Sequence, residues 1–132
     1  LWHRNAEKNV AFIQKFLDRA RKHHITVGIF TSWYDWLIIT NDFTGINDNG
    51  YVELWYWHTL GYQFGNKAAR DFEDFREFGD WTGIVLKQYE MNERICNVKA
   101  NVNIMNAGGR SNNEFHRKIL ADKDHKIQQN LE

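Results

Sequence analysis

Three apolar runs decide the fold of this chain: ITVGIFTSWYDW from Ile25, YVELWYWHTLG from Tyr51 and GIVLKQYE from Gly83. Each run reads as a short strand that leads through a turn into a helix or loop. A fourth run, CNVKANVNIM, follows from Cys96 at similar spacing. Strands that alternate with helical stretches predict parallel βαβ units, in which the residues at the carboxyl ends of the strands form the ligand site.

The expected strands are Ile25–Phe30, Val52–Trp57, Ile84–Tyr89 and Val98–Met105. Asn9–His24 carries apolar residues at three- and four-residue steps, which predicts an amphipathic helix. Ser32 is placed to cap a short helix over Asp35–Ile39. A further helix is expected over Ala68–Phe78, with Gly79 as its C-cap. The sequence therefore predicts an α/β domain over residues 1–106, and the polar segment 107–132 reads as a helical or frayed tail.

The composition excludes several classes of partner. The chain carries 17 basic and 17 acidic residues, so no excess charge attracts nucleic acid or an anionic membrane. No stretch is long and apolar enough to span a membrane, and no signal peptide is recognisable. The six His residues lack the spacing of metal ligands and no phosphate-binding loop occurs, so we expect neither a metal nor a cofactor.

Aromatic residues make up 15% of the chain and include six Trp, well above ordinary usage. A bulky core accounts for most of the Phe residues, but the Trp residues cluster at predicted strand ends. The side chains at those ends are Trp33, Trp55, Trp57, Gln88 and Asn101. This combination of aromatic and amide groups suits a sugar or another flat polar ligand.

Four stretches carry a resemblance to a known family: NVAFIQKFLDRARKHHITVGIFTSWYDW, LWYWHTLG, FEDFREFGDW and LKQYEMNERICNV. In their order and spacing they resemble the glycoside hydrolase family 25 lysozymes, and in particular the nematode branch. The resemblance covers roughly Trp2 to Met105. That family is a modified (β/α) barrel that cleaves the glycan of bacterial peptidoglycan.

The resemblance implies that this chain matches the second half of the barrel only. A complete barrel takes about 200–250 residues, so the expected fold is an open half (β/α) barrel with parallel strands. Such a half barrel exposes unpaired strand edges, which favour self-association. The Asp-X-Glu motif that carries the proton donor of the family lies on a strand before Leu1 in this comparison.

The resemblance also implies substrate-binding positions. Phe30 matches a position where the family often has a Tyr of the sugar site, and Trp55 matches the Trp of its Leu-Trp motif. Trp57 replaces a smaller residue, and Gln88 matches the Gln of a Gln-Tyr motif. Asn101 falls where many members carry an active-site Asp, and an amide cannot act as a base or stabilise a cation as a carboxylate does.

Glycoside hydrolysis generally needs two carboxyl groups that flank the scissile bond. Asp35, just beyond a strand end, is the best-placed candidate, and Glu90 is the second. A solvent-facing or capping role for Asp35 and a loop position for Glu90 are the simpler alternatives. Glu53 begins a strand, and Asp80 falls on the expected wet side of a helix.

Two functions from different classes stay open from the sequence. The first is a lysozyme-like domain for cell-wall glycan breakdown or antibacterial defence, which binds peptidoglycan or a related glycan but is inactive alone. The resemblance implies an extracellular or lysosomal location for it. The alternative is a non-catalytic glycan-binding or protein-interaction domain, and a third interpretation is a degenerate gene product without activity.

Overall fold

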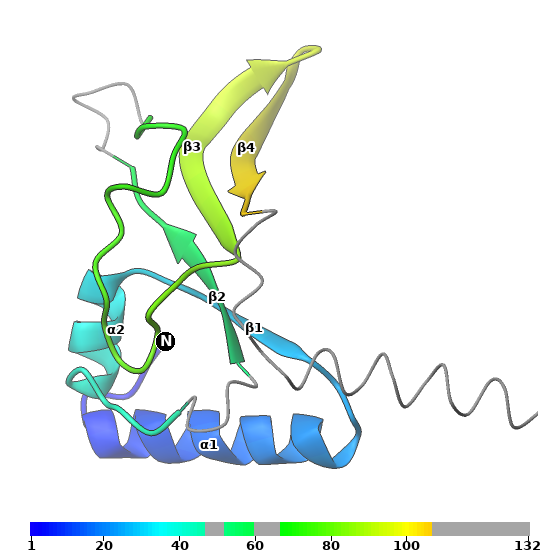
Figure 1. The fold of residues 1–132 in the computed structure, drawn as a ribbon. Helices are drawn as coiled ribbons and strands as arrows, with labels where there is room; N and C mark the ends of the chain where they lie inside the picture. Colours follow the sequence, from blue (N-terminus) through cyan, green and yellow to red (C-terminus); the bar gives the residue numbers. More distant parts are fainter. Residues whose placement is uncertain (47–51, 60–66, 107–132) are drawn as a thin grey trace, which may run out of the picture.

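A computed structural model describes residues 1–46, 52–59 and 67–106 (Figure 1). These residues form two helices and a four-stranded sheet with the strand order β1–β2–β3–β4. The elements are α1 (Ala6–Lys22), β1 (Val27–Thr31), α2 (Trp33–Thr40), β2 (Val52–Trp57), β3 (Leu86–Ile95) and β4 (Val98–Met105). The α/β class predicted from the sequence is confirmed. The predicted tail over 107–132 lies outside the described residues, so the domain boundary before it stays a prediction.

Helix α1 forms where the apolar periodicity predicts it. Its apolar stripe, which includes Ile13 and Leu17, is buried against the rest of the domain. The helix begins earlier than the apolar stripe suggests because Asn5 caps it, its side chain accepting a hydrogen bond from the backbone N–H of Lys8 at 3.0 Å. Basic residues fill the last turn before His23, where they suit the helix dipole.

Helix α2 follows β1 directly. Ser32 is its N-cap as predicted, and its hydroxyl accepts a hydrogen bond from the backbone N–H of Asp35 at 3.2 Å. The helix starts at Trp33, two residues before the predicted start. It ends at Asn41, whose φ of 58° is the left-handed conformation common just past a helix end.

The first three strands are parallel and lie in sequence order, as predicted. Val27 of β1 pairs with Val52 of β2, and Trp55 of β2 pairs with Leu86 of β3. Both connections return the chain to the same end of the sheet, so the carboxyl ends of β1 and β2 lie together, and the end of β2 at Trp57 pairs with Gln88 near the start of the long strand β3 (Figure 1). This edge is where a ligand site is expected in an open α/β sheet.

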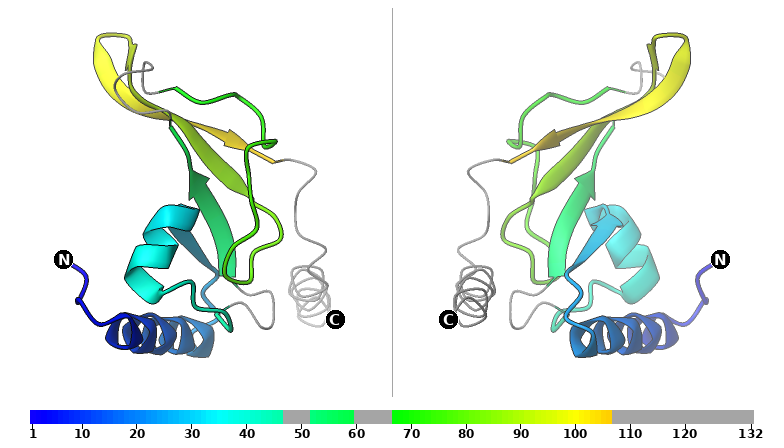
Figure 2. Two further views of the ribbon diagram at one scale, coloured as in Figure 1. Left: turned by 90° about the vertical axis from the view of Figure 1, so that its left-hand side faces the viewer. Right: turned by 90° about the vertical axis from the view of Figure 1, so that its right-hand side faces the viewer.

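The parallel pairing predicted for the last strand is wrong. Strand β4 runs antiparallel to β3, and the two form a hairpin that projects away from α1 (Figures 1 and 2). Only Cys96 and Asn97 separate the strands, with φ values of 48° and 66°. Two residues with positive φ make a tight hairpin turn, whereas parallel strands need a crossover of a dozen or more residues.

The helix predicted over Ala68–Phe78 is also absent, and the chain there is irregular. Buried Lys87 supplies the reason, because its ammonium group donates hydrogen bonds to the backbone carbonyls of Ala69 and Asp71 at 3.0 and 2.8 Å. Carbonyls turned towards a side chain are withdrawn from helical bonding. Phe75, expected on the inner face of a helix, packs edge-to-face on Tyr56 instead.

The hydrophobic core lies on one face of the sheet. It consists of Ile13, Leu17, Trp36, Ile46, Val52, Leu54, Tyr56, Phe78, Trp81 and Ile84. Trp36 and Trp81 meet edge-to-face at 5.0 Å, and both indole N–H groups donate to backbone carbonyls. Both helices therefore pack on this face, and the opposite face is left for other contacts.

Candidate functional site

The face of the sheet opposite the core carries most of the predicted site. Along β2 the buried side chains of Leu54 and Tyr56 alternate with the more exposed Trp55 and Trp57, as predicted from the sequence. Because paired residues of neighbouring strands share a face, side chains of all four strands meet here. We call this surface the open face; it comprises Gly28, Phe30, Trp55, Trp57, Gln88 and Asn103.

An aromatic pair occupies the middle of the open face. The rings of Phe30 and Trp55 meet edge-to-face with centroids 5.0 Å apart, and both side chains are more than a third exposed. The indole N–H of Trp55 donates a 3.0 Å hydrogen bond to Oδ1 of Asn103 on β4. This bond holds the Trp55 ring in place on the open face.

Asn103 is a site residue that the sequence reasoning missed. Its partner across the hairpin is Gln88, which places it at the aromatic pair. The sequence could have indicated Asn103 only if the hairpin had been recognised, because the antiparallel register decides which Asn of β4 lies beside Gln88. Asn101 lies further out on the hairpin, where its side chain accepts a hydrogen bond from the backbone N–H of Asn92 at 3.2 Å.

The second contact of the open face joins β2 to α2. The indole N–H of Trp57 donates to Oδ2 of Asp35 at 2.7 Å. Asp35 sits in the first turn of α2, so the fold brings the best-placed candidate acid beside two of the predicted sugar-binding residues. Asp35 and Trp57 share a cavity of about 560 Å³ with Phe30, Trp2, Phe12 and Phe16.

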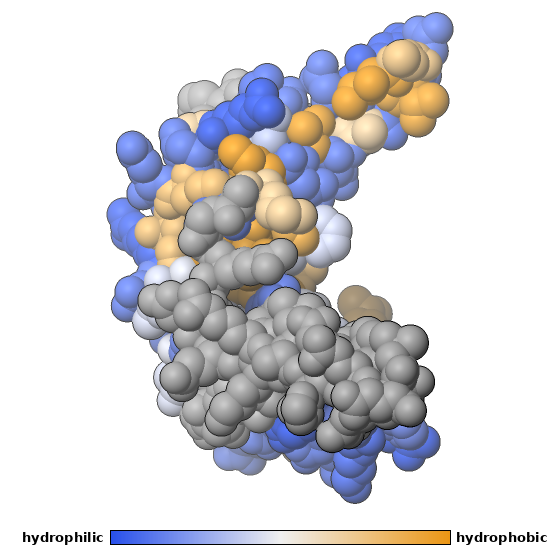
Figure 3. Space-filling model, turned by 45° about the vertical axis from the view of Figure 1, so that its right-hand side comes forward, coloured by the Kyte–Doolittle hydropathy of each residue, from blue (hydrophilic) through white to orange (hydrophobic). Residues whose placement is uncertain are grey.

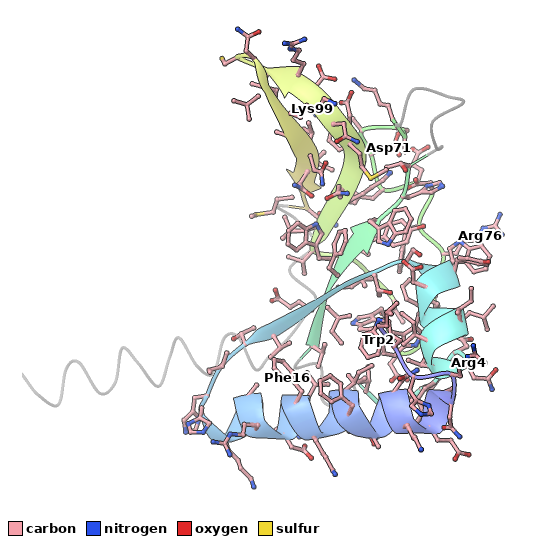
Figure 4. The ribbon with its side chains drawn as sticks, turned by 180° about the vertical axis from the view of Figure 1, so that it is seen from behind. Trp2, Arg4, Phe16, Asp71, Arg76 and Lys99 are labelled. Atoms are coloured by element: carbon pink, nitrogen blue, oxygen red, sulfur yellow. The ribbon has the colours of Figure 1, made fainter. Side chains whose placement is uncertain are left out.

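Most of that cavity is apolar and lies beside the outer edge of β1. Phe16 points from α1 towards β1, and Trp2 lies between α1 and α2 (Figure 4). Phe12 and Phe16 are both more than half exposed, whereas Phe is among the residues most often fully buried in folded proteins. The cavity is therefore an apolar surface of the kind that marks an interface or a ligand groove.

The remaining candidates on β3 are buried. Gln88 is 6% exposed, so it lies deeper than Trp55 on the same face. Glu90 is 7% exposed and forms an ion pair with Lys67 at 3.1 Å. The hydrogen bond and the charge of Glu90 raise the pKa of Lys67. A register shift separates Gln88 from Glu90, and no contact joins Glu90 to Asp35 within the described residues.

A polar network that the sequence reasoning did not identify lies on the core face. Lys87 is fully buried and pairs with Asp74 at 2.6 Å, and the other carboxylate oxygen of Asp74 contacts His58. Burial alone raises the pKa of Asp74, but the hydrogen bonds from Lys87 and His58 outweigh it and hold that pKa below its usual value. Burial, with the nearby Asp74 charge, raises the pKa of Tyr56 to about 12.

This network fixes the irregular segment over the sheet. It ties residues 69–74 to β3 and to the end of β2. Among the described residues no group of three His, Cys, Asp or Glu side chains is arranged to hold a metal ion. The helices of the described part of the chain are too short or too polar to cross a membrane.

The fold and the open face define a class: an α/β domain with aromatic, amide and carboxylate side chains gathered near the carboxyl edge of a mainly parallel sheet. Residues 1–89 match the family described as Lysozyme-like protein 1. The chain belongs to this lysozyme-like family, which is related to the glycoside hydrolase family 25 lysozymes. The family resemblance inferred from the sequence is confirmed.

Two nematode relatives illustrate the match. Over 107 residues the chain is 38% identical to Lysozyme-like protein 7 of Caenorhabditis elegans, covering 81% of this chain and 37% of that protein. It is also 38% identical to Lysozyme-like protein 2 of the same organism, covering 81% of this chain and 38% of that protein. A Dictyostelium discoideum protein named Probable GH family 25 lysozyme 4 is 29% identical over 97 residues, covering 74% of this chain and 41% of that protein.

The chain thus spans roughly two fifths of the length of these relatives. No solved structure matches it.

Proposed function

We propose that this chain is the glycan-holding part of a lysozyme-like barrel that acts on bacterial peptidoglycan or a related glycan, in cell-wall breakdown or antibacterial defence. In this proposal β1, α2, β2 and β3 are an open half of a (β/α) barrel, and the open face is its inner surface. Parallel strands in sequence order and the family membership support it. The proposed location is extracellular or lysosomal, on the ground of the family alone.

One observation carries the proposal: the Phe30–Trp55 pair and the Trp57–Asp35 pair lie on the same face. Aromatic rings stack on the C–H surfaces of sugars, and carboxylate and amide groups bind sugar hydroxyls. Hydrogen bonds to Asn103 and Asp35 hold the two indole rings in place before a ligand arrives. A preorganised surface loses less conformational entropy on binding.

The first test measures glycan binding. Soluble peptidoglycan fragments are expected to quench the Trp fluorescence of the chain, and Trp55→Ala should weaken the affinity by about threefold to tenfold. Val98 is an exposed apolar residue on the hairpin, so Val98→Ala is the matched control and should bind glycan like the unchanged chain. Equal affinities for Trp55→Ala and the unchanged chain would contradict the proposed site.

We further propose that the chain alone does not cleave glycan. Cleavage needs two carboxyl groups on either side of the bond. Asp35 accepts a hydrogen bond from Trp57, Glu90 is paired with Lys67, and the amide of Asn101 lies out on the hairpin. A missing general acid alone lowers the rate by about 10²–10⁴-fold.

Release of reducing ends from peptidoglycan tests the catalytic half of the proposal. The purified chain should release none above background. Release that is abolished by Asp35→Asn or Glu90→Gln would show that the chain is an enzyme and would identify its acid. Restored activity in a longer protein with an upstream Asp-X-Glu strand is the outcome expected if the relatives' full length is needed.

The apolar cavity beside β1 favours a second candidate, a protein-interaction domain. Phe12 and Phe16 are exposed there next to a strand edge that carries no charge. A partner chain bound at this cavity would protect them from water. Fluorescence distinguishes the two functions, because an interaction domain of this kind leaves Trp emission unchanged when glycan is added.

A further inference from the structure

A second cleft lies on the opposite side of α2 from the Asp35–Trp57 pair. It has a volume of about 200 Å³ and is lined by Trp33, Leu37, Asp42, Arg76, Glu77 and Phe78. Trp33 and Leu37 are four residues apart, so they share one face of the helix. Arg76 lies beside the beginning of α2, near the carboxyl edge of the sheet (Figure 4).

Three polar groups of this cleft have no hydrogen-bond or ion-pair partner within the described part of the chain. Arg76 and Glu77 form no ion pair or hydrogen bond there, although both are long charged side chains beside one another. The indole N–H of Trp33 also has no acceptor among these residues, whereas those of Trp55 and Trp57 do. Trp33 is 47% exposed, so its ring is available to a ligand.

The chemistry of the lining selects among ligands. An anion such as phosphate would be attracted by Arg76 but repelled by Glu77 and Asp42, and a cation would meet the reverse. A neutral ring with hydroxyl groups suits all of them, because a hydroxyl both accepts from a guanidinium and donates to a carboxylate. The volume is below the usual 300–1,000 Å³ of a drug-sized site, so it fits one ring rather than a whole oligosaccharide.

We propose that this cleft is a second carbohydrate subsite that takes one pyranose ring. The ring stacks on Trp33, and its hydroxyl or acetamido groups bind Arg76 and Glu77. Asp42 shapes the cleft through its carboxylate, which accepts a hydrogen bond from the backbone N–H of Gly79 at 3.2 Å. The inference rests on the proposed function for the choice of a sugar, but not on the open face.

Calorimetric titration with a β-1,4-linked N-acetylglucosamine tetramer tests the subsite. Trp33→Ala and Arg76→Gln should each weaken the affinity by about threefold to tenfold. Ile38→Ala is the matched control, because Ile38 is an exposed apolar residue on α2 that does not line the cleft. It should bind like the unchanged chain.

Trp55→Ala, measured in parallel, separates this inference from the proposed function. If Trp55→Ala weakens binding while Trp33→Ala and Arg76→Gln do not, the subsite is overturned and the open face stands. If only the Trp33 and Arg76 variants weaken binding, the subsite is supported and the open face is overturned. Absence of any binding of the tetramer to the unchanged chain overturns both.

Discussion

Lys87 shows how one side chain decides a local fold. Its ammonium group is fully buried and donates hydrogen bonds to two backbone carbonyls and to the Asp74 carboxylate. Lys87→Met should destabilise the domain by about 3–5 kcal/mol, because it breaks the buried ion pair with Asp74 and leaves two backbone carbonyls without their donor. Urea denaturation followed by Trp fluorescence measures this loss. The exposed Lys99 gives the control Lys99→Met, and equal midpoints for the two variants would refute the role of Lys87.

The pH dependence of stability belongs to Asp74. Its pKa is lowered in the folded chain from the usual 3.8, so its ionised form contributes stability above that value. The contribution is lost as pH falls through the lower, folded pKa. The free energy of unfolding should therefore fall in acid, and Asp74→Asn should flatten that fall. An unchanged pH profile in the variant would contradict the assignment.

For single residues, the sequence predicted correctly which side chains of a strand share a face. Trp55 and Trp57 share a face because alternate residues of a strand must do so. Asn103 was missed because its position depends on the hairpin register. The buried role of Lys87 was missed because lysine is almost never fully buried without a partner, and its partners come from a segment expected to be helical.

Two glycines test the packing of the elements around them. Gly79 has a φ of 53°, and a Cβ there would lie 2.9 Å from Nε1 of Trp36. Gly79→Ala should therefore cost about 1–3 kcal/mol of stability. At Gly28 the nearest atom to a Cβ would be 3.8 Å away, so Gly28→Ala should be neutral or slightly stabilising. A thermal melt compares them, and equal melting temperatures would contradict the packing described.

Element types were predictable wherever a local pattern was decisive. The stripe of α1, the Ser32 cap and the alternation of β2 were each sufficient. The prediction of a helix over 68–78 was wrong. The Phe spacing there fits a helix, but the hydrogen bonds from Lys87 to the backbone override that local preference. The prediction that β4 is parallel was wrong because neither turn residue, Cys96 or Asn97, is a glycine, the usual marker of a tight hairpin turn.

In the part of the chain that the structure describes, β1 is an open strand edge of the sheet. Among the described residues β1 pairs only with β2, and its sequence VGIFT carries no charge that would discourage pairing. We predict that the isolated chain is dimeric, aggregating or only marginally stable. Light scattering after size-exclusion chromatography measures this, and a sharp monomeric peak with a cooperative melt would contradict it.

A charged residue in the cavity beside β1 should reduce that association. Phe16→Glu should shift the chain towards the monomer, because the side chain is 58% exposed and points towards β1 (Figure 4). Lys15→Glu, at an exposed position of the same helix, is the control and should leave the distribution between monomer and dimer unchanged.

The hairpin is a second apolar region, with hydrophobic residues such as Ile95 exposed on it (Figure 3).

At the scale of the molecule the sequence predicted the class, the strand order and the family. It did not specify the reversal at Cys96 and Asn97 that makes β4 antiparallel. The half-barrel interpretation stays a proposal, supported by three parallel strands and by relatives of more than twice the matched length.

The central claim is that the open face holds glycan, and NMR of the indole N–H groups tests it most directly. Trp55 and Trp57 donate to Asn103 and Asp35 on the open face, whereas Trp36 and Trp81 donate to backbone carbonyls on the core side. On titration with soluble peptidoglycan fragments, the signals of Trp55 and Trp57 should move in a saturable way. Those of the core pair should stay in place. Unmoved Trp55 and Trp57 signals at saturating glycan would contradict the account.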